Sequence, residues 1–575
     1  MSADASHPAH PEPPRRNGGI AAGLRFAAGC LLLAAILFLP ERPVDLERFS
    51  PGAVPVELLA AIGLVVLAAG SSWLFRASLI VICSLAGIIL FLKLADLGTF
   101  TAFGRPFNPL LDLIIIKDGW NLLTGTIGRT EAAAVIAAAI LAWSATVLLL
   151  GYCLAGARRM ARAKRMAACG LVVALAAIGV LFARLSPGES ARAAILAPTA
   201  STYLTTRVAL MRRSAIDLAA FEKALEGDPL SDLDEGTLLD ALKGRDVYVL
   251  FVESYGRTVL ADETYRALIA PRLSAIEADL RKAGLAARSG WMTSPTVGGQ
   301  SWLAHGALLA GLPTTDQSRY DRMIASRRKS LNTLFREAGW HTIGIMPAIS
   351  MEWPEGGYYG YDELYVANTL GYEGLPFNWV TMPDQFTLAA AKRAADAASG
   401  PVMVEAALIS SHAPWTPIPR LVPWDDVGDG RIFDAQALAG DPPSVVWAEP
   451  DRIRDHYIRS IDYALETIGD FIAKFGEDAV FVVLGDHQPS RLLTGDGAPR
   501  DVPFHIIAND RALLERLDGM DLVAAMTPDE TSDTMAMWDF RERFVNAMSG
   551  AESDGEPGIR PGLVRTGEPA AGGNG

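Results

Sequence analysis

Long apolar runs dominate the first third of the chain and then stop. Five of them, at roughly residues 19–40, 53–75, 77–98, 131–154 and 167–185, are long enough to cross a bilayer, which takes about 20 residues in a helix. The first run is too long for a cleaved signal sequence and lacks a convincing cleavage site, so we expect a retained helix. The pattern predicts a five-helix transmembrane domain over residues 19–187.

Basic residues between the apolar runs predict how this domain is oriented. The most basic stretch, residues 157–165, connects the fourth and fifth runs, and Arg15, Arg16 and Arg76 flank other runs. The positive-inside rule places all of them, and the N-terminus, in the cytoplasm. Five crossings then put everything after about residue 187 outside. We therefore predict a multi-pass protein of the bacterial plasma (inner) membrane with a periplasmic or extracellular C-terminal part.

Strand-like and helix-like segments alternate between residues 241 and 549. The expected strands cover residues 247–252, 285–292, 341–346, 402–409, 479–484 and 503–508, and the expected helices cover 262–283, 301–310, 329–338, 384–398 and 451–474. Alternation of this kind predicts one α/β domain with a mostly parallel central sheet and helices on both faces.

Three shorter segments complete the organisation. Residues 1–18 and 550–575 are rich in small and polar residues and in proline, which predicts disordered ends. Residues 188–240 are expected to form connecting helices, and 199–226 show helical periodicity with arginines on a mostly apolar background. This helix either rests on anionic lipid or packs on the α/β domain as a plain linker.

Charge and cysteine content narrow the classes of partner. The formal net charge of −14 argues against nucleic acid. All four cysteines, Cys30, Cys83, Cys153 and Cys169, lie in or beside the apolar runs. The α/β domain therefore contains no disulfide, although an exported compartment would permit one.

Two strands of the expected sheet end in acidic residues. The run Val480 to Leu484 leads to Asp486 and His487, and the run of residues 247–252 leads to Glu253. Ligands of open α/β sheets bind at the carboxyl ends of the strands, and a mixed carboxylate and imidazole set suits zinc or manganese better than calcium. Asp486 and His487 alone would equally fit a loop aspartate and a surface histidine, so the prediction depends on convergence with Glu253.

Ser301 is the best-placed nucleophile of the chain. It follows a glycine pair at residues 298–299 and opens an apolar helical pattern that runs through Leu309. Free backbone N–H groups and the dipole at a helix N-terminus favour an anionic nucleophile or a bound phosphate. Ser294 and Thr296 remain alternative nucleophiles in the same loop.

These motifs resemble the alkaline phosphatase superfamily in its membrane-anchored sulfatase-like branch. The Val-Glu-Ser of residues 252–254 looks like the first metal carboxylate of that branch, and Ser301 stands where its Thr or Ser nucleophile lies. Residues 485–487, Gly-Asp-His, resemble its metal-binding Asp-His, and the helix at 455–472 is also similar. The resemblance covers roughly residues 240–545, and it indicates lipoteichoic acid synthases and periplasmic glucan phosphoglycerol transferases as relatives.

Two absences favour the lipoteichoic-acid-synthase-like branch. The exported domain has no Cys/Ser-x-Pro-x-Arg motif, which a formylglycine sulfatase needs, and no cysteines for the disulfides common in phosphoethanolamine transferases that modify lipid A. One departure is that Ser301 replaces the threonine usual among the closest transferases. Serine can perform the same chemistry.

The resemblance also implies substrate contacts. His412 follows the strand at 402–409, where the family often has a histidine that contacts the phosphoryl group or the leaving oxygen; the alternative is a satisfied loop histidine. Trp353 lies in an aromatic and acidic loop where lipoteichoic acid synthases hold glycerol phosphate with a tryptophan and an arginine, but no arginine stands in the matching stretch. An aromatic loop that covers the sheet edge is the alternative for Trp353.

Two further residues are candidate substrate contacts. His305 stands four residues after Ser301, so the two would share a helix face, although family members generally lack this histidine. Arg257 closely follows Glu253. Three other histidines, His341, His456 and His505, have strand or helix settings typical of structural residues.

The resemblance implies a metal-dependent phosphotransferase. One divalent cation (Mn²⁺, Mg²⁺ or Zn²⁺) would be held by Glu253, Ser301, Asp486 and His487. Ser301 would attack phosphatidylglycerol or phosphatidylethanolamine, with His412 protonating the leaving oxygen. The phospho-serine would then pass phosphoglycerol or phosphoethanolamine to a glycan or lipid acceptor of the cell envelope. The alternatives are a phosphodiesterase or sulfatase-like hydrolase, and a non-catalytic membrane protein of the same fold.

Overall fold

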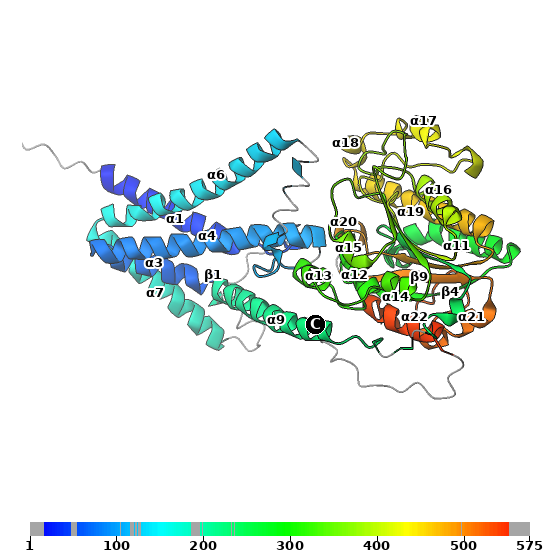
Figure 1. The fold of residues 1–575 in the computed structure, drawn as a ribbon. Helices are drawn as coiled ribbons and strands as arrows, with labels where there is room; N and C mark the ends of the chain where they lie inside the picture. The colour runs from blue at the N-terminus through cyan, green and yellow to red at the C-terminus, as the bar shows by residue number, and fades with distance from the viewer. Residues whose placement is uncertain are drawn as a thin grey trace, which may run out of the picture.

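The computed structural model comprises an apolar helical region followed by an α/β domain (Figure 1). It describes residues 17–47, 54–103, 105–114, 120, 123–124, 128–185, 196–197, 199–231, 233–234, 236–495 and 497–550. Disorder was expected for residues 1–18 and 550–575, of which 1–16 and 551–575 lie outside this part of the chain, whereas residues 17 and 18 begin a helix.

Each expected apolar run contains a helix. These helices are α1 (Asn17–Phe38), α3 (Val56–Ala68), α4 (Ser72–Phe103), α6 (Arg129–Leu154) and α7 (Arg162–Leu185). Among the described residues, three helical stretches are long and apolar enough to cross a membrane, namely Ile20–Phe38, Ser72–Phe103 and Arg129–Arg159. The apolar helix α3 is shorter. The number of crossings therefore stays a prediction.

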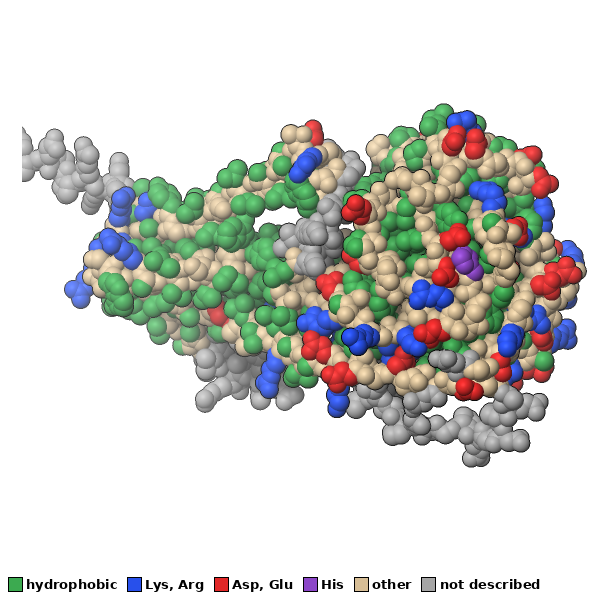
Figure 2. All heavy atoms as spheres, in the orientation of Figure 1, with side chains coloured by type: hydrophobic (Ala, Val, Ile, Leu, Met, Phe, Trp, Pro, Cys, Tyr) green, Lys and Arg blue, Asp and Glu red, His purple; other side chains and the backbone are tan. Residues whose placement is uncertain are grey.

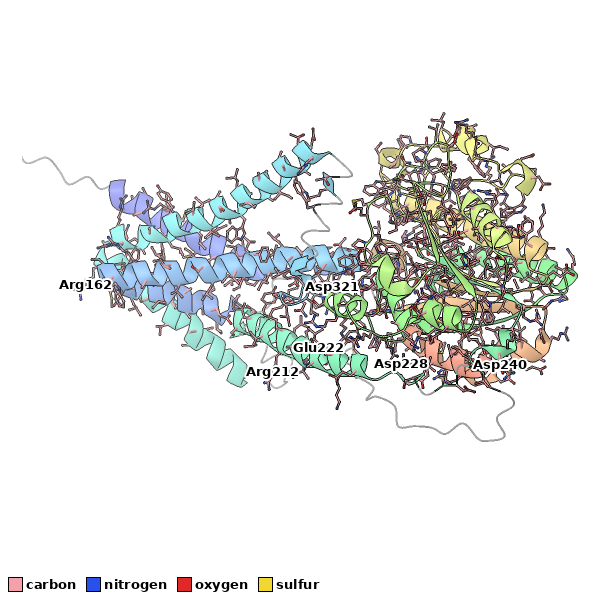
Figure 3. All side chains as sticks on the ribbon, viewed as in Figure 1. Arg162, Arg212, Glu222, Asp228, Asp240 and Asp321 are labelled. Carbon is pink, nitrogen blue, oxygen red and sulfur yellow. The ribbon has the colours of Figure 1, made fainter. Side chains whose placement is uncertain are left out.

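The basic segment lies at the end of the helical region that is far from the α/β domain. Figure 3 labels Arg162 at that end, and Figure 2 shows Lys and Arg side chains gathered there. Helix α4 runs from there to the α/β domain and contacts α20 (Arg491–Thr494). This placement is compatible with an inside location of residues 157–165, and the orientation itself stays a prediction.

Helix α9 (Ala200–Glu226) joins the two parts. Near its start, Arg207 pairs with Asp96 of α4 at 2.7 Å. Near its end, Phe221 is buried in the core of the α/β domain. The packing supports the interpretation as a linker helix, and contact with lipid is untested.

An eight-stranded sheet forms the centre of the α/β domain, in the order β10-β4-β9-β8-β3-β7-β5-β6. The strands are β3 (Asp246–Val252), β4 (Ala286–Thr293), β5 (His341–Met346), β6 (Glu363–Val366), β7 (Val402–Leu408), β8 (Ala479–Gly485), β9 (Asp501–Ala508) and β10 (Thr534–Ala536). Strand β9 is antiparallel to both neighbours, and the other pairs in this sheet are parallel. The expected mostly parallel sheet is therefore confirmed; the short strands β6 and β10 were not expected.

Helices cover both faces of the sheet, as expected, and two apolar cores result. One core includes Phe386 of α16 (Asp384–Ala397) and Ile461 of α19 (Pro450–Phe475), and the other includes Leu303 of α12 (Ser301–Ala310) and Phe544 of α22 (Phe540–Met548). The remaining described helices of four or more residues are short except α11. The bounds of the helices are α2 (Pro43–Glu47), α10 (Thr258–Ala261), α11 (Glu263–Lys282), α12 (Ser301–Ala310), α13 (Gln317–Ile324), α14 (Leu331–Glu337), α15 (Gly356–Tyr359), α16 (Asp384–Ala397), α17 (Asp434–Ala437), α18 (Pro443–Val446), α19 (Pro450–Phe475), α21 (Arg511–Glu515) and α22 (Phe540–Met548).

The central strands β3 and β8 position the candidate chemistry. All residues of β8, and all but the first of β3, are buried, which explains their continuous apolar runs because helices cover both faces. Their register pairs Val252 with Gly485. Glu253 and Asp486 therefore leave the sheet side by side at the same edge.

Candidate active site

Local backbone constraints fix the two carboxylates at this edge. The N–H of Glu253 donates to the carbonyl oxygen of Leu408 at 3.0 Å. Position 485 accepts no residue other than glycine, because a Cβ there would overlap the carbonyl oxygen of Tyr255. The backbone N–H groups of Ser254 and His487 donate to Asp486 Oδ1 at 2.8 and 2.6 Å, which holds its side chain in place.

Glu253, Asp486 and His487 form a buried cluster that fits a divalent cation. One ligand atom from each lies within 4.8 Å of the others. His487 Nε2 is 3.5 Å from Glu253 Oε1 and 3.6 Å from Asp486 Oδ2. Its other nitrogen, Nδ1, bonds the carbonyl oxygen of Gln488 at 2.8 Å. A histidine fixed in this way presents Nε2 as a ligand.

The carboxyl groups of Glu253 and Asp486 are both buried, and the nearby histidines do not supply enough positive charge to balance two carboxylates. Burial, and then the neighbouring Glu253, raise the pKa of Asp486. Burial also opposes ionisation of Glu253, but His487 and His412 outweigh it and lower the pKa of that carboxyl. For His487, burial is outweighed by Asp486 and Glu253, so its pKa is raised. A divalent cation would supply the missing positive charge, and the donor set therefore fits such an ion.

Ser301 lies directly against this cluster, as the first residue of α12. Its Oγ donates to Glu253 Oε2 at 3.1 Å and lies 3.2 Å from His487 Nε2. The approach to the helix passes through positive φ angles at Gly298 (73°), Gly299 (144°) and Gln300 (63°), which glycine adopts without strain. The glycine pair therefore serves the sharp turn that brings Ser301 to the sheet edge.

The two alternative nucleophiles have other partners. Ser294 Oγ donates to the carbonyl oxygen of Asp486 at 2.6 Å, and Thr296 Oγ1 donates to that of Gly299 at 2.8 Å. Both residues are buried, and their hydrogen bonds connect backbone segments of the loops. Their geometry favours Ser301 as the nucleophile.

Ser254 contacts the cluster and was not a sequence-based candidate. Its Oγ donates to Glu253 Oε1 at 2.8 Å, and its φ is 57°. Tyr457 of α19 donates to the Ser254 carbonyl oxygen at 2.9 Å. A positive φ at a serine has no signal in the sequence, so this contact was not predictable from it.

His412 lies in the loop that follows β7, at the same edge of the sheet. It is exposed, its Nδ1 lies 2.6 Å from the carbonyl oxygen of Ala413, and it is close enough to Glu253 to lower the pKa of that carboxyl. Asp384 holds the base of the loop by accepting hydrogen bonds from the N–H groups of Ile409 and Ser410 at 2.8 and 2.9 Å. His412 is thus exposed at the edge of the sheet that also carries Ser301.

Trp353 and Arg257 are engaged elsewhere. The ring of Trp353 stacks on Tyr359 with 5.7 Å between the ring centroids, and among the described residues no hydrogen bond or ring contact joins it to Ser301. Arg257 pairs with Asp501 at 3.0 Å and lies over the ring of Trp291. The structure therefore does not bring these two candidate substrate contacts to the cluster.

His305 is buried one turn along α12 from Ser301. Its ring stacks on Phe251 of β3, with 3.7 Å between the ring centroids. Its Nδ1 lies 2.7 Å from Glu405 Oε1 of β7. The histidine thus lies between the nucleophile helix and the sheet.

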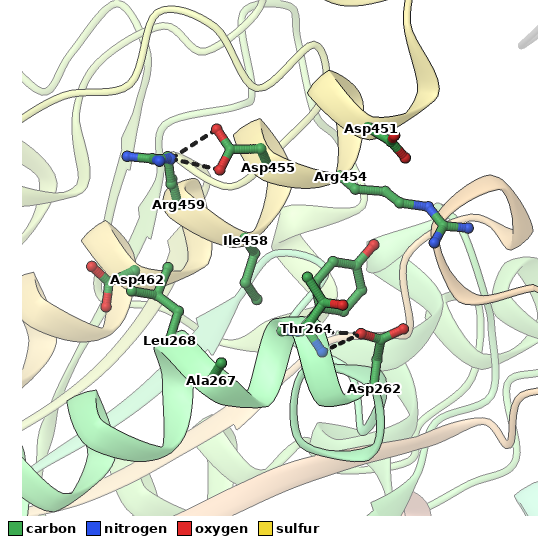
Figure 4. Close-up of a pocket in the computed structure, with 11 residues that line it drawn as sticks. Asp262, Thr264, Ala267, Leu268, Asp451, Arg454, Asp455, Ile458, Arg459 and Asp462 are labelled. Carbon is green, nitrogen blue, oxygen red and sulfur yellow. Dashed lines mark hydrogen bonds and ion pairs between the residues drawn. The ribbon is translucent and has the colours of Figure 1, made fainter.

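A separate groove of about 500 Å³ lies between α11 and α19 (Figure 4). It is lined by Asp262, Thr264, Tyr265, Ala267, Leu268, Asp451, Arg454, Asp455, Ile458, Arg459 and Asp462. None of the candidate catalytic or metal-binding residues belongs to it. Its charged side chains include the ion pair of Asp455 and Arg459.

Comparison with known proteins supports the assignment of the domain. Residues 247–512 match the protein-family model described as Sulfatase. No curated protein matches the chain. The match confirms, for the α/β domain, the expected resemblance to sulfatases.

Three of the solved structures to which the chain is similar come from bacterial proteins. The lipoteichoic acid synthase LtaP from Listeria monocytogenes is 15% identical over 57% of this chain and 77% of that chain, with a TM-score of 0.37. The lipooligosaccharide phosphoethanolamine transferase A from Neisseria meningitidis, an integral membrane protein, is 16% identical over 92% of this chain and 94% of that chain, with a TM-score of 0.42. The Streptococcus pyogenes phosphoglycerol transferase GacH, in complex with sn-glycerol-1-phosphate, is 13% identical over 57% of this chain and 90% of that chain, with a TM-score of 0.35.

Proposed function

We propose that this chain, whose residues 247–512 match the sulfatase family, is a membrane-anchored, metal-dependent phosphotransferase. It takes a phosphoglycerol or phosphoethanolamine group from a phospholipid and passes it, through a phospho-serine, to a glycan or lipid of the cell envelope. The observation that carries the proposal is the contact of Ser301 Oγ with both Glu253 and His487 at a helix N-terminus. A nucleophile, its activating groups and an anion-binding helix end meet at one point.

Glu253, Asp486 and His487 would hold one divalent cation, Mn²⁺, Mg²⁺ or Zn²⁺, and Ser301 would complete the ligand set. When bound, such a cation lowers the pKa of a coordinated hydroxyl and offsets charge on phosphoryl oxygens. Glu253, Asp486 and His487 are all buried. Their burial keeps water from the sheet side of the site, and electrostatic interactions are stronger where water is excluded.

The residues of the chain would perform the first transfer as follows. Ser301 Oγ donates a hydrogen bond to Glu253 Oε2, so the Glu253 carboxylate would take the proton while Oγ forms a bond to phosphorus, and would return it to Oγ at the end of the cycle. The bond between phosphorus and the diacylglycerol oxygen breaks, and His412 gives that oxygen a proton.

In the second transfer an acceptor hydroxyl attacks the phosphorus of phospho-Ser301 and gives its proton to His412. The bond between Oγ and phosphorus breaks, and Ser301 recovers its proton. Two successive displacements at the same serine regenerate the enzyme. A membrane anchor keeps the domain where a lipid donor is concentrated.

The test is mass spectrometry of the full chain, solubilised in detergent and incubated with Mn²⁺ and either phosphatidylglycerol or phosphatidylethanolamine. We expect a phosphodiester adduct on the peptide that contains Ser301, with release of diacylglycerol, and no adduct in Ser301→Ala. Release of diacylglycerol and free head-group phosphate despite an added acceptor sugar would identify a hydrolase. Bound metal with neither adduct nor diacylglycerol from either lipid would contradict the proposal.

A further inference from the structure

A buried polar network lies one turn below the nucleophile. Glu405 of β7 is 1% exposed and accepts three hydrogen bonds, from His305 Nδ1 at 2.7 Å, Asn332 Nδ2 at 2.9 Å and Tyr361 Oη at 2.6 Å. None of the three hydrogen bonds to Glu405 involves Glu253, Asp486 or His487. The three hydrogen bonds offset the cost of burying the Glu405 carboxyl, and they fix the orientation of the His305 ring.

His305 directs one of its nitrogens away from this network. In the neutral tautomer whose Nδ1 donates to Glu405, Nε2 is an acceptor. Nε2 has no hydrogen-bond partner among the described residues, yet it is not sealed from solvent, and 11% of the side chain is exposed. Nε2 is therefore available to a ligand.

A partly exposed residue of β7 lies beside the residue on which His305 stacks. Every residue of β7 is buried except Ala407, which lies on the same face as Glu405 and one step closer to the carboxyl edge. Ala407 pairs in register with Phe251, the residue on which His305 stacks. Ala407 is thus a partly exposed position between the ring of His305 and the carboxyl edge of the sheet, where Ser301 lies.

The separation matches the length of a small head group. Side chains four residues apart on a helix have Cβ atoms about 5–6 Å apart, so Ser301 and His305 are about one helical turn from each other. A phosphorus atom on Ser301 that carries an ester-linked group of two or three carbons would bring the end of that group to His305.

We propose, on the basis of the proposed phosphotransferase function, that His305 is a specificity-determining residue that accepts a hydrogen bond from a hydroxyl of the transferred head group, and so selects phosphoglycerol. Glu405 is its positioning residue. An ammonium group needs several acceptors or an accessible carboxylate. Glu405 is the carboxylate of this network, and it is buried with both oxygens already bonded. A hydroxyl needs only the free nitrogen of His305.

The experiment compares the rate of adduct formation on Ser301 from phosphatidylglycerol, from phosphatidylethanolamine and from bis(4-nitrophenyl) phosphate, a diester without a head-group hydroxyl. We expect the wild-type protein to prefer phosphatidylglycerol. His305→Phe should lower that rate about 10- to 100-fold and change the other two less than about twofold. His305→Gln, which retains a polar side chain for Glu405, should give an intermediate loss and decides the question if the phenylalanine variant does not fold.

A matched control separates specificity from stability. His505 is also buried, but on the opposite face of the sheet, where it bonds Ser289 and Tyr255, so His505→Gln should leave the ratio of the lipid rates unchanged. A wild-type preference for phosphatidylethanolamine, or an equal loss with all three substrates in the His305 variants, would overturn the inference and leave the proposed function standing. Absence of any adduct in the wild-type protein would instead remove the proposed function itself.

Discussion

Two clusters of buried charge in this molecule differ in how their charges are matched. At the junction of α4 and α9, Asp96 accepts hydrogen bonds from Arg207 at 2.7 Å and from Tyr203 at 2.6 Å. Lys93, on the same helix as Asp96, donates to two backbone carbonyl oxygens at 2.8 and 2.6 Å. Acidic and basic groups balance at this junction.

The edge of the sheet lacks that balance. Glu253 and Asp486 are both buried, and within the described part of the chain His487 is the one basic side chain at ion-pair distance from them. Burial of charge costs several kcal/mol per ion unless it is paired. The difference indicates that the junction is a structural joint, whereas the sheet edge is built to receive a cation and a reacting group.

The largest effect should come from the residue that links the sheet-edge cluster to the substrate. Replacement of Ser301 by Ala removes the nucleophile and should lower turnover at least about 10³-fold, with metal affinity nearly retained, since three ligands remain. Ser254→Ala is the matched control, because its hydroxyl also contacts Glu253, and it should keep the covalent adduct. Release of diacylglycerol from labelled lipid measures the turnover of both variants. Persistent turnover in Ser301→Ala would show that another hydroxyl is the nucleophile.

Asp96→Asn should lower the stability of the protein without lowering its metal affinity. The substitution leaves the guanidinium of Arg207 buried without its carboxylate, and breaking a buried pair in this way costs about 3 kcal/mol. Thermal denaturation of the solubilised full chain measures the loss. An unchanged midpoint would mean that the junction cluster does not join the two parts of the molecule.

His505 is a buried histidine whose pKa is shifted by burial, and it tests the effect of burial on stability. Burial lowers its pKa to about 3, below the ordinary value of about 6.5. The folded state therefore excludes a proton that the unfolded state binds, so this contribution to stability is complete above about pH 6.5 and is lost at about 1.4 kcal/mol per pH unit below it. Denaturation midpoints at pH 7.5 and 5.5 should differ less in His505→Gln than in the wild type; an identical pH dependence would refute the assignment.

The smallest effect should come from charges that are exposed. Asp455 and Arg459 form an ion pair on α19 with about half or more of each side chain in solvent, and such pairs contribute roughly 0.3–0.5 kcal/mol. Arg459→Gln should leave turnover and metal content unchanged and shift the denaturation midpoint by about 1 °C. A clear loss of activity would assign a role to the groove between α11 and α19.

The strands that carry the site were predictable because burial on both faces leaves a continuous apolar run. Strands β3, β7 and β8 have nearly the expected bounds, and the expected start of α12 at Ser301 is confirmed. Strands β6 and β10 were not predicted because they are short, and β6 is partly exposed. Neither has the apolar run that identified the others.

Site residues that stand at the ends of strands and helices were predictable from the sequence. Contacts that depend on which side chains meet in the folded protein were not. Glu253, Asp486 and Ser301 follow from strand and helix ends, which topology alone brings to one edge. Arg257 follows Glu253 closely in the sequence but pairs with Asp501, far along the chain, and Trp353 stacks on Tyr359 of its own loop. Glu405 was not predicted, because an acid inside an apolar strand has no partner until the fold supplies His305.

The most direct test of the account is the metal affinity of the full chain, measured by titration of the metal-free protein with Mn²⁺ or Zn²⁺. We predict one ion per chain in the wild type, at least about a 100-fold loss of affinity in Asp486→Asn, and unchanged affinity in folded Asp96→Asn. Asp486→Asn retains an Oδ1 that can accept the backbone hydrogen bonds of Ser254 and His487, so its fold should persist. A wild-type protein that binds no ion, or an affinity that Asp486→Asn does not change, would contradict the claim that the sheet edge is a metal-dependent active site.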